Sequence, residues 1–458
     1  MPEKYHIKTH PVPPRRPRIG KCGIVDWRED CANCHNCVKK ACVFDRYRQE
    51  TNYIRGMKDM DAFFFDCQGC FSCVQKCTKG VLALATNPVY ERMGNRYWTP
   101  AIIETTWKQA ETAKVPVSGA GYRGPFTGPG FDSMWTDMSE IVRPTRDGIH
   151  GREYISTAVD IGRKPSLIHF SSAKPAEGLP PLENIPMPMI IDMMPGAYRI
   201  PKLLPVFKQV VAQLGIILIV DSKDWGLVGN DIDKYLPNLA FYLGKDAPLP
   251  LKELLQKMQL IEISDDDKID QRIKELKTIN PGIVIAIRID LEDGGQQRAI
   301  ELAKKKNVEV LHLVADINGD QVGVQNPMFI KDMVRQVHNA LVKGGNRNEI
   351  TLMAGGGIAL AEHMAKQILC GADLVTINLP LLVALECQLC AVCRYGGSCP
   401  AHIEECDDKY AAGRMVNLMA AWHDQLIEMM GAMGIREVRR LRGEVGRALF
   451  FEELEEAT

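Results

Sequence analysis

The fold is indicated by one stretch of the sequence, IVIAIRIDLEDGGQQRAIELAKKKNVEVLHLVAD, which spans residues 283–316. Its two ends, 283–290 and 308–316, are runs of Val, Ile and Leu with the length of buried strands, and the helical pattern of residues 298–307 lies between them. Continuous apolar strands that alternate with helices are typical of a parallel sheet covered on both faces.

The same alternation extends over residues 186–382, and eight apolar runs argue for a TIM (β/α)8 barrel. A doubly wound open sheet is the structural alternative, because it produces the same local pattern. The runs are MPMIIDMM (187–194), GIILIVD (215–221), LAFYL (239–243), LIEIS (260–264), IVIAIRID (283–290), VEVLHLVAD (308–316), ITLMAGG (350–356) and LVTINL (374–379).

Twelve of the fifteen cysteines fall into three runs spaced like the ligands of iron–sulfur clusters. A disulfide framework is typical of short secreted chains, and structural zinc sites usually use separated C-x2-C pairs, so we favour three 4Fe-4S clusters over both. The runs are Cys31, Cys34, Cys37 and Cys42; Cys67, Cys70, Cys73 and Cys77; and Cys387, Cys390, Cys393 and Cys399.

The first two runs suggest a ferredoxin-like module in which the last cysteine of each run binds the other cluster. We therefore expect Cys77 to complete the first cluster and Cys42 the second, although neither precedes the proline of the bacterial pattern. The remaining cysteines, Cys22, Cys370 and Cys406, are expected to be packing residues or to support the ligands.

The chain has 458 residues, 46% hydrophobic residues and a net charge of −1, so no global field draws it to nucleic acid or to an anionic membrane. We expect no membrane span and no signal peptide, and the reduced cysteines favour the cytoplasm. The predicted segments are an N-terminal arm with the ferredoxin-like module (1–85), a Gly/Pro-rich wrapping segment (86–185), the barrel (186–386), and a third cluster segment with C-terminal helices (387–458).

Two glycine-rich motifs are candidates for nucleotide-binding sites. GAGYRG (119–124) matches G-x-G-x-x-G, but PFTGPGF follows it and cannot open a helix, so we favour a loop there. Gly355, Gly356 and Gly357 end the seventh run, and Gly371 and Ala372 open the eighth unit. Barrels often bind phosphate near their last two strands, so these residues predict an FMN phosphate site; a tight strand-to-helix turn is the alternative.

Residues 354–400, AGGGIALAEHMAKQILCGADLVTINLPLLVALECQLCAVCRYGGSCP, resemble the central FMN-binding domain of glutamate synthases, particularly the archaeal type with a ferredoxin module. The likeness extends over about residues 20–458, and MMPGAYR (193–199) looks like a changed version of the family's loop after strand one. The resemblance implies FMN in the barrel. Beside Gly355–Gly357, Gly371 and Ala372, the FMN-binding residues it suggests are Met194, Pro195, Gly196, Ala197, Arg288, Gly319 and Asn378.

The departures from the family fall on its substrate loops. VDSKDWG (220–226) and SDDDK (264–268) replace the motifs after strands two and four, so we expect no glutamate synthase activity. Arg288 replaces a lysine near the flavin and is the predicted catalytic residue, either as a fixed cation or paired with Asp290 or Asp316.

These features predict an electron-transfer subunit of a multisubunit oxidoreductase, which passes electrons between FMN and three 4Fe-4S clusters. An enzyme acting directly on a small anionic substrate, with Arg288 as its anion clamp, and a scaffold with empty sites are the alternatives. The expected partners are other redox subunits, such as an NAD(P)H-, hydrogenase-, formate- or ferredoxin-linked flavoprotein, and no nucleic acid.

Overall fold

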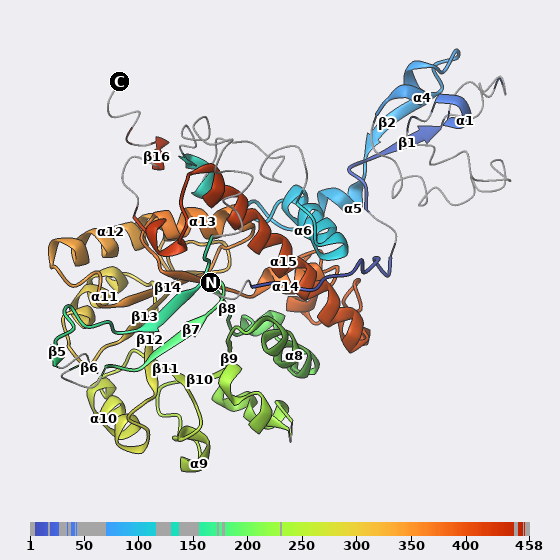
Figure 1. Cartoon of the computed structure of the whole chain (residues 1–458). Helices are drawn as coiled ribbons and strands as arrows, with labels where there is room; N and C mark the ends of the chain where they lie inside the picture. Colours follow the sequence, from blue (N-terminus) through green and yellow to red (C-terminus); the bar gives the residue numbers. More distant parts are fainter. Residues whose placement is uncertain are drawn as a thin grey trace. The chain divides into compact units, whose positions relative to one another are not determined.

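The computed structural model divides the chain into two compact units (Figure 1). The larger is drawn from residues 1–12, 105–387 and 392–458, and the smaller from residues 13–104 and 388–391. The structure describes residues 5–16, 19–26, 34, 38–41, 43, 70–115, 130–136, 155–171, 174–175, 179–229, 231–443, 448–451 and 453. The motif GAGYRG (119–124) lies outside these residues.

The larger unit is built on a closed barrel of eight parallel strands, which confirms the predicted TIM-like fold and excludes the open sheet. Each strand pairs with its neighbours in chain order, and the last pairs with the first. The strands are β8 (Met189–Ile191), β9 (Leu218–Asp221), β10 (Leu239–Leu243), β11 (Leu260–Ser264), β12 (Val284–Asp290), β13 (Val310–Val314), β14 (Thr351–Gly355) and β15 (Leu374–Ile377).

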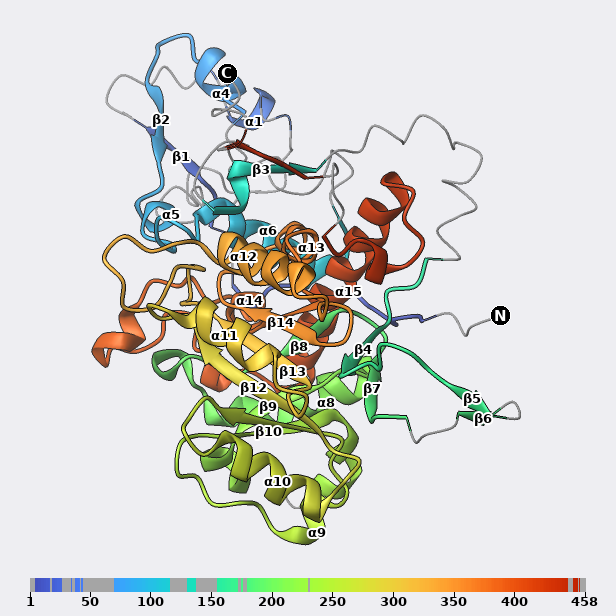
Figure 2. The same ribbon diagram turned by 90° about the vertical axis from the view of Figure 1, so that its left-hand side faces the viewer.

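Helices surround the barrel in the order that alternating strands and helices require (Figure 2). Their apolar faces pack on strands that are buried along almost their whole length. These helices are α8 (Leu204–Leu214), α9 (Lys252–Leu255), α10 (Ile269–Ile279), α11 (Gly295–Ala303), α12 (Ile330–Lys343), α13 (Ala361–Leu369) and α14 (Leu379–Ala384).

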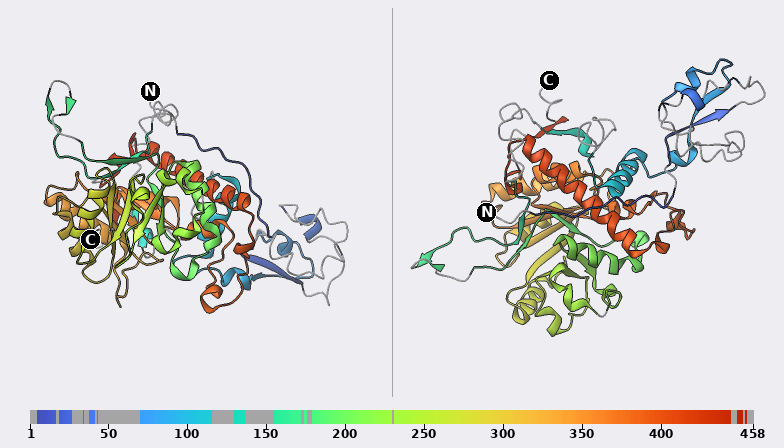
Figure 3. Two further views of the ribbon diagram at one scale, coloured as in Figure 1. Left: turned by 90° about the horizontal axis from the view of Figure 1, so that it is seen from below. Right: turned by 45° about the vertical axis from the view of Figure 1, so that its right-hand side comes forward.

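A long C-terminal helix, α15 (Asp408–Ala432), completes the helical layer (Figure 3). The helix after the last barrel strand, α14, has only 6 residues, and α15 packs against both α8 and α13. The buried Arg414 of α15 donates to the carbonyl oxygens of Ala384 (2.5 Å) and Val12 (3.0 Å). α15 therefore fastens part of the N-terminal arm to the barrel.

Short antiparallel pairs lie outside the barrel. β4 (Val159–Gly162) pairs with β7 (Leu182–Ile185), and the Gly162 amide donates to Thr351 Oγ1 (3.1 Å) at the start of β14. This pair therefore covers the amino-terminal end of the barrel. Further pairs join β5 (Phe170–Ser171) with β6 (Lys174–Pro175), and β3 (Met134–Thr136) with β16 (Ala448–Phe450).

The smaller unit contains an antiparallel pair, β1 (Cys22–Asp26) with β2 (Leu82–Thr86). Its short helices α1 (Val38–Ala41), α4 (Ser72–Gln75) and α5 (Pro88–Glu91) lie along the cysteine-rich sequence, and α6 (Pro100–Thr112) follows them. Among the described helices, none combines the length and apolar character that a bilayer crossing requires.

Gly357 shows how closely loops approach one another at the mouth of the barrel. Its φ is +68°, and a Cβ there would lie 2.5 Å from Gly319 Cα. We predict that Gly357→Ala lowers the free energy of unfolding by about 2–4 kcal/mol, since it adds backbone strain and an overlap that backbone atoms cannot relieve. Urea unfolding followed by circular dichroism measures the change.

Gly226→Ala is the matched control, because a Cβ at Gly226 meets no atom within 4 Å and its φ is ordinary. This variant should change the free energy of unfolding by less than about 0.5 kcal/mol. Equal unfolding midpoints for the two variants would contradict the packing assigned to Gly357.

Candidate functional site

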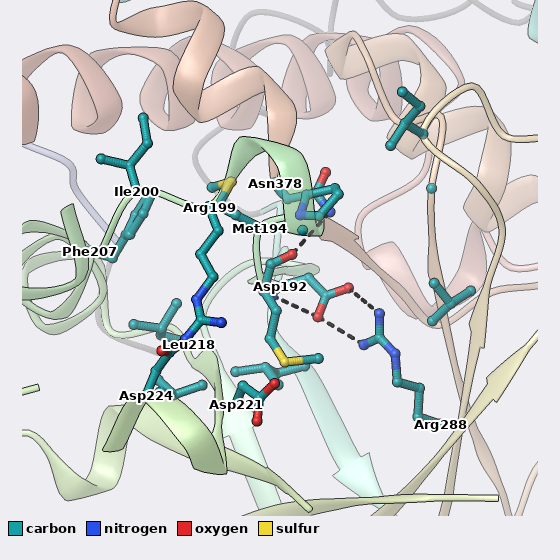
Figure 4. A pocket seen from close by; sticks show the side chains of 18 of the residues that line it. Asp192, Met194, Arg199, Ile200, Phe207, Leu218, Asp221, Asp224, Arg288 and Asn378 are labelled. Carbon is teal, nitrogen blue, oxygen red and sulfur yellow. Dashed lines mark hydrogen bonds and ion pairs between the residues drawn. The ribbon is translucent and has the colours of Figure 1, made fainter. Parts of the chain in front are cut away.

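A cavity of about 670 Å³ opens at the carboxyl-terminal ends of the barrel strands (Figure 4). This is the end at which TIM barrels hold their ligands. The loop after β8, Met193–Gly196, forms one wall, and Gly356 and Asn378 follow β14 and β15. The cavity is thus assembled from loops that are far apart in the sequence.

The loop after β8 is fixed at its start, because Met193 is held by hydrogen bonds on both its amide and its carbonyl group. Asp192 Oδ1 accepts from the Met193 amide (2.8 Å), and Asn378 Nδ2 donates to the Met193 carbonyl oxygen (3.3 Å). Asn378 also caps α14, because its Oδ1 accepts from the Leu379 amide (2.6 Å). Asn378 therefore joins the first and last barrel strands at the edge of the cavity.

A buried ion pair lies at the floor of the cavity. Arg288, near the end of β12, donates from Nη1 and Nη2 to the two carboxylate oxygens of Asp192 at 2.9 and 3.1 Å. Nη1 also donates to Glu262 (3.4 Å), while Asp290 lies 3.9 Å from Nε. Asp192 is therefore the principal partner of Arg288, ahead of the expected Asp290 and Asp316.

A second hydrogen-bonded pair, formed by Glu262 and His312, extends this network into the barrel interior. His312 on β13 hydrogen-bonds Glu262 through Nδ1 and Thr376 through Nε2 (2.9 Å). Both Glu262 and His312 have 0% of their surface exposed. A carboxylate at this depth requires charged or hydrogen-bonding partners, and Glu262 has Arg288 and His312.

Asp192, Glu262 and His312 are also residue types that bind metals, and one ligand atom from each lies within 4.8 Å of the others. The Arg288 guanidinium donates to both carboxylates, so positive charge is already supplied. Burial alone would raise the pKa of Asp192, but the charge of Arg288 and its hydrogen bonds hold this pKa below the ordinary value. The cluster is best described as an ionic network.

The glycine run Gly355–Gly357 packs against other parts of the chain. A Cβ at Gly355 would overlap the side-chain oxygen Thr376 Oγ1, and one at Gly356 would lie 2.6 Å from the carbonyl oxygens of Ala315 and Asp316. Thr376 and the loop after β13 thus require glycine at these positions, as the predicted alternative of a tight turn implies. Only Gly356 of the three lines the cavity.

Half of the predicted FMN-binding positions line this cavity, and half do not. Gly371 and Ala372 precede β15 and therefore lie at the amino-terminal end of the barrel, away from the cavity. The lining positions are Met194, Pro195, Gly196, Arg288, Gly356 and Asn378; the others are Ala197, Gly319, Gly355, Gly357, Gly371 and Ala372.

Two further arginines, Arg199 and Arg394, line the cavity, and neither is among the site residues predicted from the sequence. Arg199 forms an ion pair with Asp224. Arg394 lies over the ring of Tyr198, with 4.9 Å between its Cζ and the ring centroid, and has no carboxylate partner among the described residues. Arg394 is therefore the lining arginine whose charge is available to an anion.

Arg394 also connects the cavity with the third cysteine run, because it directly follows Cys393 in the 3-10 helix Val392–Tyr395. Within the larger unit, Cys387 is buried, Cys399 is half-buried and Cys393 is exposed. Cys390, in the smaller unit, is half-buried. Arg394, which lies between Cys393 and Cys399, thus forms part of the wall of the cavity at the mouth of the barrel, called the barrel-mouth cavity below.

The first two cysteine runs are described only in part. Backbone hydrogen bonds, led by Ser72, lower the pKa of the Cys70 thiol. Burial raises the pKa of Cys77, but hydrogen bonds from the backbone of residues 79–82 outweigh it and the net shift is downward. Amides directed at sulfur favour the thiolate that cluster ligation needs. Cys34 and Cys73 are also described, whereas Cys31, Cys37, Cys42 and Cys67 lie outside the described residues.

Two of the three leftover cysteines, Cys370 and Cys406, are buried. Cys370 is buried with its Sγ 3.7 Å from Met134 Sδ, and burial raises the pKa of its thiol to about 12. An inert packing role fits Cys370. Cys22 begins β1 in the smaller unit.

Sequence reasoning missed Asp192, Glu262, His312 and Thr376. A signal was present, since a carboxylate within LIEIS and a histidine within VEVLHLVAD interrupt strands that are otherwise apolar. Buried polar residues at such positions need partners across the barrel. The sequence alone does not say which strands face one another in the interior, so the partners were not identifiable.

These features define a (β/α)8-barrel protein with a ligand cavity over an ionic floor and a cysteine run at its edge. Residues 252–436 match the family model described as the conserved region in glutamate synthase. The predicted resemblance to the FMN-binding domain of glutamate synthases is thereby confirmed.

Two relatives match over nearly their whole length. The chain is 25% identical to the archaeal-type glutamate synthase [NADPH] of Dehalococcoides mccartyi, over 92% of this chain and 93% of that protein. It is 24% identical to the archaeal glutamate synthase [NADPH] of Archaeoglobus fulgidus, over 92% of each chain. Among solved structures, a mutant flavocytochrome b2 with benzoylformate has a TM-score of 0.42 and 11% identity, and covers 78% of this chain and 88% of that one.

The ionic floor yields a stability prediction. Arg288→Gln leaves Asp192 and Glu262 buried without their cation, so we expect the free energy of unfolding to fall by about 3–5 kcal/mol. Urea unfolding measures the loss. Adding Asp192→Asn to this variant should recover part of it, because the second change removes one uncompensated charge.

Arg298→Gln is the control, because Arg298 also binds an aspartate, Asp265, through several hydrogen bonds, but with 38% of its side chain exposed. Its loss should be below about 1 kcal/mol. The stabilisation of the folded state by the ionised Asp192 is fully present above the unfolded-state pKa of about 3.9. It disappears as the pH falls through the lower folded-state pKa of Asp192. Similar losses in the Arg288 and Arg298 variants would contradict the special role of the buried pair.

Proposed function

We propose that this chain is an iron–sulfur flavoprotein of the glutamate synthase type, and that it passes electrons between FMN in the barrel-mouth cavity and three 4Fe-4S clusters. The observation that carries the proposal is that Arg394, next to Cys393 in the third cysteine run, lines this cavity. A ligand in the cavity therefore lies beside a segment that the cysteine spacing assigns to a cluster.

The residues present fit a flavin in three respects. The cavity falls within the range of about 300–1,000 Å³ typical of cofactor and ligand sites. A side chain at Gly196 would project into open space, since a Cβ there meets no atom within 4 Å. Met194, Pro195 and Asn378 add apolar and polar lining. When bound, FMN supplies a group that takes up electrons in pairs and releases them singly.

The charges around the cavity suggest roles for its arginines. Arg288 is held by Asp192 and Arg199 by Asp224, whereas Arg394 has no carboxylate partner among the described residues. We therefore assign Arg394 to the FMN phosphate, in place of the glycine run. Arg288, with its charge balanced by Asp192, would orient the ring and keep the floor of the cavity dry.

The pairing of Arg288 with Asp192 also bears on the alternative function, in which the chain acts directly on a small anionic substrate. An enzyme that clamps a small anionic substrate with Arg288 needs uncompensated positive charge there, but this guanidinium is already paired with the carboxylates of Asp192 and Glu262. This favours electron transfer over direct substrate binding at Arg288. We further propose that the chain has no glutamate synthase activity and works in the cytoplasm with other redox subunits, such as an NAD(P)H-, hydrogenase-, formate- or ferredoxin-linked flavoprotein.

Cofactor analysis tests the proposal as a whole. Protein purified without oxygen should contain about twelve irons and twelve acid-labile sulfides, four per cysteine run, together with one FMN. Iron and sulfide assays, EPR of the reduced protein and chromatography of the released flavin measure these contents.

Three results would contradict the proposal in different parts. A content of about eight irons per chain would mean that only two clusters are present. Bound zinc would mean that the cysteine run that holds it is not a cluster site. FAD in place of FMN, or no flavin, would disprove the FMN assignment. Glutamate formed from 2-oxoglutarate and ammonia at an enzymatic rate would show that amination has been retained.

Arg394→Gln tests the link between the cysteine run and the cavity. We expect the affinity for FMN to fall by at least about tenfold, because a charge-assisted hydrogen bond to phosphate is lost. Titration of flavin-free protein with FMN, followed by flavin fluorescence, measures the affinity. Arg440→Gln is the control, since Arg440 is 75% exposed and does not line the cavity. Unchanged affinity in the Arg394 variant would disprove its contact with the phosphate.

A further inference from the structure

A second cavity, of about 910 Å³, lies beside the first at the carboxyl-terminal ends of β9 and β10. The two cavities share one lining residue, Asp221 at the end of β9. The walls of the second are formed by the turn after β9, by the long loop 244–251 after β10 and by Leu254 of α9. This cavity has no role in the function proposed above.

The body of the second cavity is apolar and rigid. Trp225 and Phe241 pack edge to face with 3.7 Å between their ring centroids, and Tyr242 lines the cavity next to them. Pro248 and Pro250 fix two backbone φ angles in the loop that forms the opposite wall. Flat aromatic walls and a stiff loop favour a ligand with a ring-sized apolar body.

The polar groups of this cavity are mainly donors. Tyr242 Oη and Trp225 Nε1 have no hydrogen-bond partner within the part of the chain that the structure describes. Burial raises the pKa of Tyr242, so its hydroxyl stays protonated at neutral pH and can donate. A donor that faces an apolar cavity favours a ligand with acceptor oxygens.

The second cavity also has an excess of positive charge. Lys223 and Lys245 line it, and neither has a carboxylate partner in the described ranges. Of the two lining carboxylates, Asp246 is paired with Lys268 at 2.9 Å. Asp221 accepts from the Lys223 backbone amide at 3.0 Å and keeps its negative charge at the edge shared with the first cavity, so the lining lysines exceed the free carboxylate by one. An anionic group would therefore meet positive charge at the side of the cavity where Lys245 lies.

We propose that the second cavity binds a small carboxylate with an apolar, ring-sized body, such as an aromatic acid. The ring would lie against Trp225 and Tyr242, and the carboxylate would face Lys245. The Tyr242 ring centroid is 5.6 Å from Arg288 Cζ, so such a ligand would be separated from the first cavity by one side chain. The proposal concerns binding alone and stands whether or not the first cavity holds FMN.

Calorimetric titration of the full chain with 2-naphthoate tests this site, and neutral 2-naphthamide is the matched probe. We expect naphthoate to bind at least about tenfold more tightly, the effect of one favourable charge interaction of about 1.4 kcal/mol. Lys245→Gln should remove this preference. Tyr242→Phe should weaken naphthoate about threefold or more, because one hydrogen bond is lost.

Lys252→Gln is the control, since Lys252 is an exposed lysine of α9 that does not line the cavity. It should leave both affinities unchanged. No binding of naphthoate at millimolar concentration, or equal binding of the two probes, would overturn the proposal. Loss of naphthoate binding in Arg394→Gln but not in Lys245→Gln would also overturn it, because the ligand would then occupy the first cavity.

Discussion

Two carboxylates inside the barrel, Asp192 and Glu262, need positive charge, and Arg288 supplies it from a third strand. A TIM barrel normally fills its interior with layers of branched apolar side chains. Here part of that volume holds an ion pair, which is stable only because every charged group has a partner. The floor of the cavity is therefore fixed by electrostatic balance as well as by packing.

This balance determines which cations remain available at the mouth of the barrel. Arg288 and Arg199 are committed to Asp192 and Asp224, so an anion entering the first cavity meets Arg394, which the cysteine-rich segment contributes. Arg394 thus brings a charged side chain of the third cysteine run into the wall of the first cavity.

The barrel was predictable from the sequence because eight apolar runs alternate with helical patterns, and this alternation has few solutions. The position of α15 was not predictable, since the shortness of α14 becomes visible only when the helices are counted around the barrel. Likewise, Asp192 and Arg288 are 96 residues apart, and periodicity does not identify partners across a barrel. The nearby Asp290 was therefore a more obvious partner than Asp192.

The glycines show that a motif can have a packing role beside the one that its pattern suggests. Gly355, Gly356 and Gly357 satisfy the pattern of a phosphate-binding turn, but the side chain of Thr376 lies against Gly355 and the backbone of residues 315–319 lies against Gly356 and Gly357. Gly196, by contrast, which lies in the family-like segment MMPGAYR (193–199), faces open space at the cavity. The space beside a glycine depends on the loops that the barrel brings together, so the glycine motif alone does not show whether that space is open to a ligand. For this reason the first cavity is better defined by Gly196 and Arg394 than by the triple glycine.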